Sequence, residues 1–299
     1  MKSSQDIAFD TSDVISAVQY NDIYYIQYKT VEAAKEAVEI FEQYPSVVFA
    51  ETDKFSHLDA MPMDSAEFAS PLIGKDGYTH LSWGITQTGL DIFADYVSEK
   101  STGTVDIAVV DSGVYTSHPL LQGYISNEQY DLVDNDAWAN DEYGHGTFVT
   151  GIIVDAMKKL NFSIIPIRIG DENGNFSAYS VYYAISQAVA TGADVINLSL
   201  SLGIGIWDYE SIHDAIDDAI ASNVVVVVTA GNKNNSTSTR CPAHLDAPIV
   251  VSGIDKNGEK YVDGNWGASV DITGPGVGVK SCAIPADSST GYGVADGTS

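Results

Sequence analysis

The chain has 299 residues, which is enough for one large domain or two unequal domains with a substantial buried core. Its 41 acidic and 14 basic residues give a formal net charge of −27, so it lacks the Lys and Arg clusters that a nucleic-acid partner requires. No apolar run approaches the ~18–20 residues of a membrane span. Two cysteines, Cys241 and Cys282, are too few for a disulfide framework.

Residues 1–55 are predicted to form a small α+β domain. Residues 23–28 are aromatic and β-branched and predict a strand, and residues 47–50 predict a second one. Residues 31–44 repeat apolar side chains at three- and four-residue intervals, which predicts a helix that Pro45 ends. No strand or helix is evident from the sequence before this group.

Residues 56–77 are rich in proline and glycine, and we expect a linker there. From residue 78 to residue 299 the chain alternates between strand and helix patterns. Strands are expected at residues 105–110, 162–169, 194–200, 224–229 and 248–253. Helices are expected at residues 146–160, 180–191 and 210–222. The strands are nearly continuous apolar runs, so the alternation predicts an α/β domain with a mainly parallel sheet covered on both faces.

Four polar residues stand within two positions of a glycine near the ends of these elements: Asp111, His145, Asn232 and Ser299. Asp111 and Asn232 each follow a predicted strand, at the edge where open α/β sheets form their sites. Each residue alone has an ordinary structural explanation: capping for Asp111, a core position for His145 and a turn for Asn232. Their order along the chain is far more specific than any one of them.

At these motifs the chain resembles the subtilisin-like serine proteases, the subtilases, over roughly residues 80–299. The matching motifs are Asp111-Ser112-Gly113, His118-Pro119, His145-Gly146-Thr147, Asn197-Leu198-Ser199-Leu200, Ala230-Gly231-Asn232 and Gly297-Thr298-Ser299. The resemblance implies a three-layer α/β/α fold and endopeptidase activity on peptide or protein substrates.

The resemblance also implies a role for each of the four polar residues. Ser299 would be the nucleophile, and His145 the general base and then the general acid. Asp111 would orient His145 and stabilise its charged form. Asn232 would share the oxyanion hole with the backbone N–H of Ser299. No cofactor is required for this chemistry.

Residues 20–54 are similar to the second half of a subtilase propeptide. Such propeptides assist folding and block the cleft with their C-terminal tail, so the chain's own first domain is an expected intramolecular inhibitor of a zymogen. We expect a secreted or cell-surface protein whose signal peptide is outside this chain, with an intracellular location as the alternative.

Two departures from the family pattern concern calcium and specificity. Leu120 stands where many subtilases carry a calcium-binding aspartate, and a hydrocarbon cannot bind a hard cation. That calcium site is therefore not expected, although the acidic surface offers others. Ser201-Leu202 replaces the paired glycines that usually edge the primary specificity pocket.

The expected substrate-binding residues are Ser199, Leu200, Ser201 and Arg240. The guanidinium of Arg240 suits an acidic side chain just before the scissile bond, and the alternative, an Arg on a solvated loop, is the more common arrangement. If the preference is acidic, Glu67 in the linker is a candidate site of self-processing.

In the family the nucleophile opens a long buried helix, and Ser299 is the last residue here. From the sequence we expect a chain cut at its nucleophile, and expect residues 1–299 alone to be inactive. Two other classes compete with the protease. One is a non-catalytic subtilase-like binding module, which the four intact motifs disfavour. The other is a nucleotide-binding enzyme, which would need a glycine-rich phosphate loop after a strand.

Overall fold

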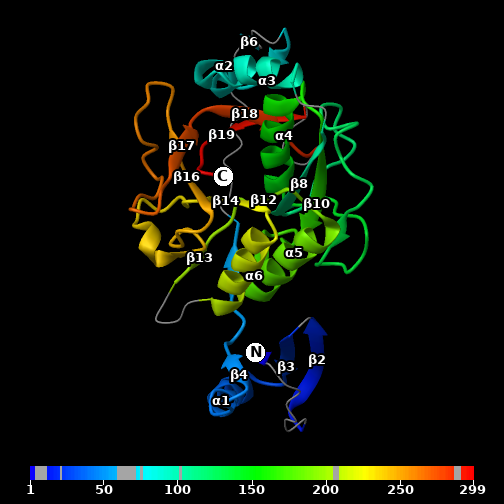
Figure 1. Ribbon diagram of the computed structural model, residues 1–299, viewed down its shortest axis with the longest axis vertical. Helices are drawn as coiled ribbons and strands as arrows, with labels where there is room; N and C mark the ends of the chain where they lie inside the picture. Colours follow the sequence, from blue (N-terminus) through cyan, green and yellow to red (C-terminus); the bar gives the residue numbers. More distant parts are fainter. Residues whose placement is uncertain are drawn as a thin grey trace.

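The computed structural model describes residues 1–3, 12–20, 22–58, 72–74, 77–100, 103–204, 209–285 and 291–299. A large α/β domain carries a small domain at one end, and the C-terminus lies in the middle of the large domain (Figure 1). Within the described residues, no helix combines the length and apolar character needed to cross a bilayer.

The large domain is built on a seven-stranded parallel sheet of order β17-β16-β14-β12-β8-β10-β9. In chain order the strands are β8 (Val105–Asp111), β9 (Tyr130–Asp131), β10 (Phe162–Arg168), β12 (Val195–Leu198), β14 (Val225–Thr229), β16 (Ile249–Ile254) and β17 (Ile272–Pro275). The expected strands are confirmed to within a few residues at their ends. The sheet's two outermost strands, β9 and β17, were not expected from the sequence.

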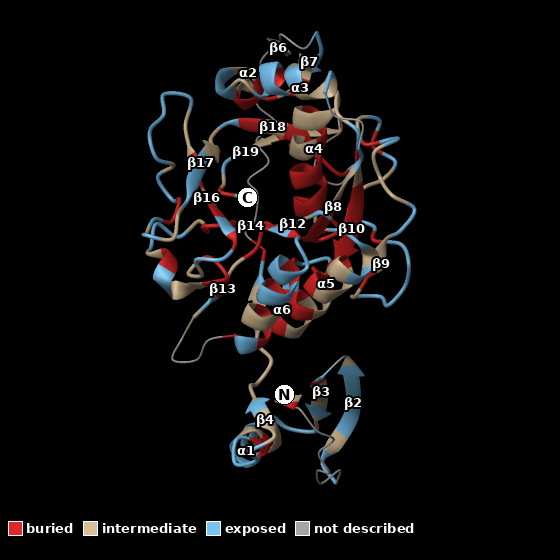
Figure 2. Cartoon of the chain, viewed as in Figure 1, coloured by how far each residue is buried: buried red, intermediate tan, exposed pale blue. Residues whose placement is uncertain are grey.

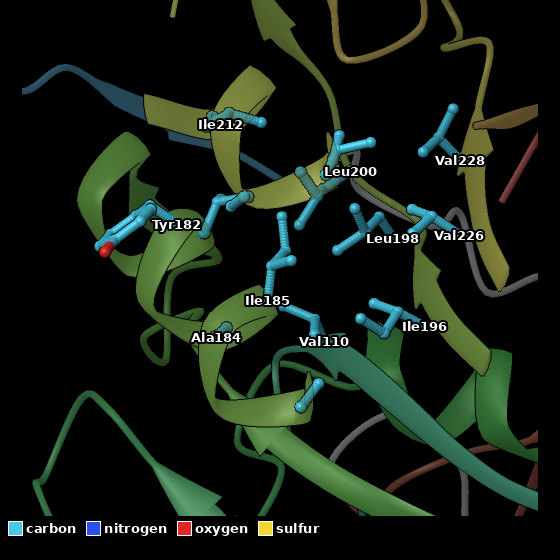
Figure 3. Packing of buried hydrophobic residues seen from close by; sticks show 14 of the residues in the cluster. Val110, Tyr182, Ala184, Ile185, Ile196, Leu198, Leu200, Ile212, Val226 and Val228 are labelled. Carbon is cyan, nitrogen blue, oxygen red and sulfur yellow. The ribbon is translucent and has the colours of Figure 1, made fainter. Parts of the chain in front are cut away.

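Helices cover both faces of this sheet. The helices of the large domain are α2 (Trp83–Thr88), α3 (Leu90–Ser98), α4 (His145–Met157), α5 (Ala178–Thr191) and α6 (Glu210–Ala221). Alternate residues of β8 face opposite sides: Ala108 and Val110 pack with α5 and α6, whereas Ile107 and Val109 pack with α4. Figure 3 shows the first of these layers, where Val110 and Ile196 from the sheet meet Ile185 of α5.

Outside the seven-stranded sheet and the sheet of the small domain, the strands form two-stranded pairs. These are β6 (Leu72–Ile73) with β7 (Thr79–His80), β13 (Leu202–Gly203) with β15 (Arg240–Cys241), β18 (Val279–Cys282) with β19 (Tyr292–Ala295), and β5 (Phe55–His57) with β11 (Asn175–Ser177). A short 3₁₀ turn, Thr237–Thr239, precedes β15. The β5–β11 pair joins the end of the small domain to the large one.

The small domain is a four-stranded antiparallel sheet, of order β2-β3-β1-β4, with one helix. Its elements are β1 (Lys2–Ser3), β2 (Val14–Tyr20), β3 (Ile23–Tyr28), α1 (Val31–Phe41) and β4 (Val47–Phe49). Thr30 caps α1 by accepting from the backbone N–H of Ala33 at 3.1 Å. Most of this domain is exposed or half-buried, in contrast to the buried α4 (Figure 2).

Three expectations about the N-terminal region were wrong. β1 and β2 exist, although no strand was expected before residue 20. The helix ends at Phe41 rather than Tyr44, because a tight turn begins there, with the N–H of Tyr44 bonded to the carbonyl of Phe41 at 3.0 Å. The segment expected to be an irregular linker begins with most of β5, which pairs with β11 in regular antiparallel register.

Candidate active site

Asp111 and His145 meet where β8 ends and α4 begins. Asp111 is the last residue of β8 and is fully buried, and His145 is the first residue of α4. Nδ1 of His145 lies 2.7 Å from Oδ1 and 2.9 Å from Oδ2 of Asp111. Since a carboxylate only accepts, Nδ1 carries the hydrogen, and Nε2 keeps its lone pair.

Glycine permits this close approach. Gly144, just before the helix, has φ of 103°, which favours glycine. A Cβ on Gly146 would lie 2.2 Å from the carbonyl oxygen of Gly113. The loop after β8 and the start of α4 therefore touch backbone to backbone, which sets the distance between Asp111 and His145.

Ser299 faces Nε2 of this histidine. Its Oγ lies 3.3 Å from Nε2 of His145, so the hydroxyl can donate to the lone pair. The neighbouring Thr298 is buried, and its Oγ1 lies 2.6 Å from Oγ1 of Thr229 at the end of β14. The end of the chain is thus held against the edge of the parallel sheet.

Asn232 follows β14 and orients its amide through Thr298. Its Oδ1 accepts from the backbone N–H of Thr298 at 2.9 Å and from the Thr298 hydroxyl at 2.8 Å. Oδ1 accepts both hydrogen bonds, so the NH₂ group is on the side of the amide that faces away from Thr298. Asn232, His145 and Ser299 line one small cavity.

A buried carboxylate, which the sequence reasoning missed, organises the loop behind these residues. Oδ1 of Asp141 accepts from the Ser112 hydroxyl at 2.8 Å and from the Gly144 N–H at 2.7 Å. Its Oδ2 accepts from the backbone and hydroxyl of Thr147 at 2.8 and 2.6 Å. Burial raises the pKa of Asp141, and these hydrogen bonds oppose the rise. Asp141 thereby ties the residue after Asp111 to both sides of His145.

Three of the four expected substrate-binding residues present polar groups to one cavity of about 390 Å³ that also reaches Ser299. These are Ser199, Ser201 and Arg240; the fourth, Leu200, borders the cavity, but its side chain belongs to the hydrophobic core and is 2% exposed. Lys233 also lines the cavity, and no Asp or Glu side chain does so among the described residues. The buried Nε of Arg240 has no hydrogen-bond partner within the described part of the chain.

The end of the small domain lies along this cavity as an extended strand. β5 pairs with β11, the Leu58 N–H donates to the carbonyl of Gly174 at 2.8 Å, and the Tyr143 hydroxyl donates to the carbonyl of Leu58 at 3.2 Å. The Leu58 side chain is 1% exposed, and its Cδ1 packs where a Cβ on Gly170 would stand. Ser56 donates to the carbonyl of Ser201 at 3.2 Å.

Two acidic residues dock the small domain on the helices of the large one. Glu51 accepts from the backbone N–H of Glu210 at 3.1 Å and from the Ser211 hydroxyl, at the start of α6. Asp53 accepts from the N–H of Tyr179 at 3.0 Å, at the start of α5. Both carboxylates lie at helix N-termini, which favour negative charge. No local pattern in the sequence predicts these contacts.

Burial changes how readily these two carboxyl groups ionise. Desolvation raises the pKa of Glu51, against the hydrogen bonds from Ser211 and the charge of the N-terminus. It also raises the pKa of Asp53, against the backbone N–H of Tyr179. Docking therefore favours the protonated form more than solvent does.

Leu120 packs against the apolar cluster beneath α4, and its N–H donates to Nδ1 of His118 at 3.1 Å. Its side chain offers no oxygen to a cation. Glu67, the self-processing candidate from the sequence, lies outside the described residues.

A model of the subtilase family matches residues 102–299. The chain is 29% identical over 263 residues to the alkaline serine exoprotease A of Vibrio alginolyticus, which covers 85% of this chain and 46% of that protein. It is 31% identical over 252 residues to the thermophilic serine proteinase of Bacillus sp. (strain AK1), which covers 82% of this chain and 58% of that protein. The chain spans about half the length of these relatives.

Solved structures show the same architecture. A cold-adapted subtilisin-like serine proteinase aligns with a TM-score of 0.58 and 30% identity, covering 65% of this chain and 69% of that one. A lanthipeptide protease aligns with a TM-score of 0.64 and 23% identity, covering 72% and 74% of the two chains, which is a likeness of fold alone. These structures confirm the expected three-layer α/β/α fold.

Proposed function

This chain belongs to the subtilase family, and we propose on that premise that it is a serine endopeptidase acting on peptide or protein substrates. The observation that carries the proposal is the continuous hydrogen-bond chain from Asp111 through His145 to Ser299. Three side chains from β8, α4 and the C-terminus meet in the order that nucleophilic catalysis requires.

In the proposed reaction, Oγ of Ser299 attacks the scissile carbonyl carbon while Nε2 of His145 takes the hydroxyl proton. The imidazolium that forms is stabilised by Asp111 and then gives its proton to the leaving amine. Water repeats the sequence on the acyl-enzyme and restores the serine. The NH₂ group of Asn232 and the backbone N–H of Ser299 donate to the oxygen that gains negative charge. The steps draw on these groups and require no cofactor.

The small domain is proposed to be a propeptide that inhibits the enzyme. Support comes from β5 and Leu58, which run beside β11 and line the same cavity as Ser299. A peptide bound by strand addition gains main-chain hydrogen bonds without needing a particular sequence. Glu51 and Asp53 hold the domain on the helices that flank this cleft.

We further propose that the enzyme prefers an acidic residue just before the scissile bond. The cavity that would receive this side chain carries Arg240 and Lys233, and the Nε of Arg240 still lacks an acceptor among the described residues. A guanidinium suits a carboxylate because its planar N–H donors match the two oxygens.

The sequence supplies such a residue at the end of the propeptide. Asp59 follows Leu58 directly, and Ala60 comes next, although both lie outside the described residues. Since Leu58 is the last described residue of the strand in the cleft, Asp59 is the first acid that the cavity would receive. We therefore propose self-processing at the Asp59–Ala60 bond in place of Glu67.

A direct test compares the protein made from its complete coding sequence with Ser299→Ala and Asp111→Asn variants. We expect the wild type to hydrolyse a denatured protein substrate and Ser299→Ala to lose that activity. Asp111→Asn should keep the fold but lower kcat by about 10⁴, because it holds the wrong histidine tautomer. Activity that survives in Ser299→Ala would refute the proposal.

A further inference from the structure

A cluster of three metal-binding side chains takes no part in the proposed reaction. It lies beside the cavity that Ser199, Ser201 and Arg240 line, which we call the specificity cavity. It consists of His213 on α6, Cys241 on β15 and His244 in the turn after β15. One ligand atom from each lies within 4.8 Å of the others. Cys241 is fully buried, and the two histidines are half-buried, with ring centroids 5.1 Å apart. We propose that this cluster binds Zn²⁺.

The hydrogen bonds of His244 set its tautomer for binding a metal. Its Nδ1 lies 3.0 Å from the carbonyl oxygen of Arg240, and its backbone N–H donates to the same oxygen at 2.9 Å. A carbonyl oxygen only accepts, so Nδ1 carries the hydrogen and Nε2 holds the lone pair that a metal needs. Histidine ligands in metal sites commonly donate their second N–H in this way.

His213 has a similar outer partner. Its Nδ1 lies 3.9 Å from a carboxylate oxygen of Glu210, one turn earlier on α6. A carboxylate there would orient the ring and raise the basicity of Nε2. The cluster therefore has one imidazole whose Nδ1 is hydrogen-bonded to a carbonyl, a second imidazole with a carboxylate nearby, and one buried thiol.

The ligand types select the metal. One thiolate and two imidazoles suit zinc, whereas Ca²⁺ and Mg²⁺ need oxygen ligands. Around a tetrahedral zinc ion the S and N ligand atoms stand ~3.3–3.6 Å apart, so the three atoms must close by about 1.5 Å at most. Rotation of the half-buried His213 ring, with a small shift of the turn that carries His244, can supply that movement. Binding converts the Cys241 thiol to a thiolate and releases its proton to solvent.

The position of the site gives zinc a structural role. The ion would cross-link α6 to β15, and Arg240, the other residue of β15, lines the specificity cavity. His244 is hydrogen-bonded to the backbone of this same residue, Arg240. Zinc is thus expected to stiffen the wall against which the substrate side chain packs and to protect it from proteolysis.

The test uses the whole chain in a Ser299→Ala background, which prevents self-digestion. Zinc content and affinity are measured by elemental analysis and titration calorimetry in excess Ca²⁺. We expect one zinc ion per chain, a higher Tm with zinc, and no tight binding in Cys241→Ser. His213→Gln and His244→Gln should each weaken binding by about tenfold or more, since each removes a direct ligand.

Two controls make the result specific. Cys282→Ser should bind zinc like the parent, because Cys282 is buried elsewhere, and burial raises its pKa to about 12. His145→Ala should also bind like the parent, which separates this site from the active-site histidine. Co²⁺ should give a thiolate-to-metal absorption band in the parent and in both controls, and Cys241→Ser should lack it.

If Cys241→Ser fails to fold, the two histidine variants and the cobalt band of the parent still decide the question. Absence of bound zinc in the parent would overturn the proposal. Equal binding by the parent and the histidine variants, or a cobalt spectrum without the thiolate band, would overturn it as well. None of these outcomes depends on protease activity, so the proposal can fail without the proposed function failing.

Discussion

Replacing Arg240 by Gln removes the guanidinium from the specificity cavity while keeping a polar, uncharged side chain. The proposed acidic preference rests on a charge-assisted hydrogen bond between this group and the substrate carboxylate. Such a bond contributes about 1.5–3 kcal/mol. Since 1.36 kcal/mol corresponds to a factor of ten, Arg240→Gln should lower kcat/KM for a Glu substrate by roughly 10- to 150-fold.

The assay uses matched fluorogenic peptides that differ only at the residue before the scissile bond, with Glu, Gln or Phe. For the wild type we expect Glu to be cleaved well ahead of the isosteric, uncharged Gln. Arg240→Gln should abolish that difference while changing cleavage after Gln by much less. Arg240→Lys should fall between them, because it keeps the charge but loses the planar fork.

A second cation lines the same cavity, so Lys233→Gln is the matched control. It should lower cleavage after Glu by less than Arg240→Gln does. The reasoning is refuted if the wild type cleaves after Phe as well as or better than after Glu. It is also refuted if Lys233→Gln and Arg240→Gln have the same effect.

Self-processing should leave Ala60 as the first residue of the mature enzyme, as read by N-terminal sequencing, and Asp59→Asn should slow its appearance. After processing, Glu51→Ala should make activity appear about 2- to 30-fold faster, because losing a helix cap lowers the stability of the docked state by a corresponding free energy. Glu42→Ala, at an exposed position, should leave this rate unchanged. Docking raises the pKa values of Glu51 and Asp53, so the docked state binds their protons more tightly than the undocked state does. Docking is therefore strongest at pH values below the ordinary pKa values of these groups, and it weakens as the pH rises through their raised pKa values. The rate at which activity appears should therefore increase with pH over that window.

Each of these predictions can be contradicted by a specific result. A mature enzyme that begins after Glu67 would favour the earlier expectation from the sequence. Equal rates for Glu51→Ala and Glu42→Ala would show that the helix cap does not hold the propeptide. Activity that appears more slowly at higher pH would contradict the sign derived from the two raised pKa values.

The positions of Asp111, His145, Asn232 and Ser299 could be predicted because each stands in a short local motif. Buried parallel strands read as continuous apolar runs, so β8 was visible from its composition. The residue after such a strand lies at the site-forming edge wherever the strand belongs in the sheet. The geometry of the four residues could therefore be anticipated without knowing the strand order.

Contacts between distant parts of the chain could not be predicted in this way. β5 is three residues long, and its pairing with β11 joins Phe55 to Ser177. β2 is mostly exposed, so it lacks the buried alternation that marks a strand in a sequence. In the sequence, Asp141 is not distinguished from the other acidic residues of the predicted loops. Only the packing of β8 against α4 brings Ser112 and Thr147 to it.

The specificity cavity could be predicted only in part. The sequence placed Ser199, Ser201 and Arg240 together through a resemblance, and the structure brings them to one cavity. It also places Leu200 in the core and adds Lys233 and the end of the small domain to the cavity lining. An acidic preference is the sharper hypothesis because the described residues that line the cavity with Arg240 include no Asp or Glu.

The central claim is that Ser299 is a nucleophile activated by His145. The most direct measurement treats the mature protein, made from its complete coding sequence, with a fluorophosphonate and locates the label by mass spectrometry. The account predicts one label per active site, on Ser299, and a much slower reaction in His145→Ala. A folded, processed protein that takes no label, or takes it on another serine, would contradict it.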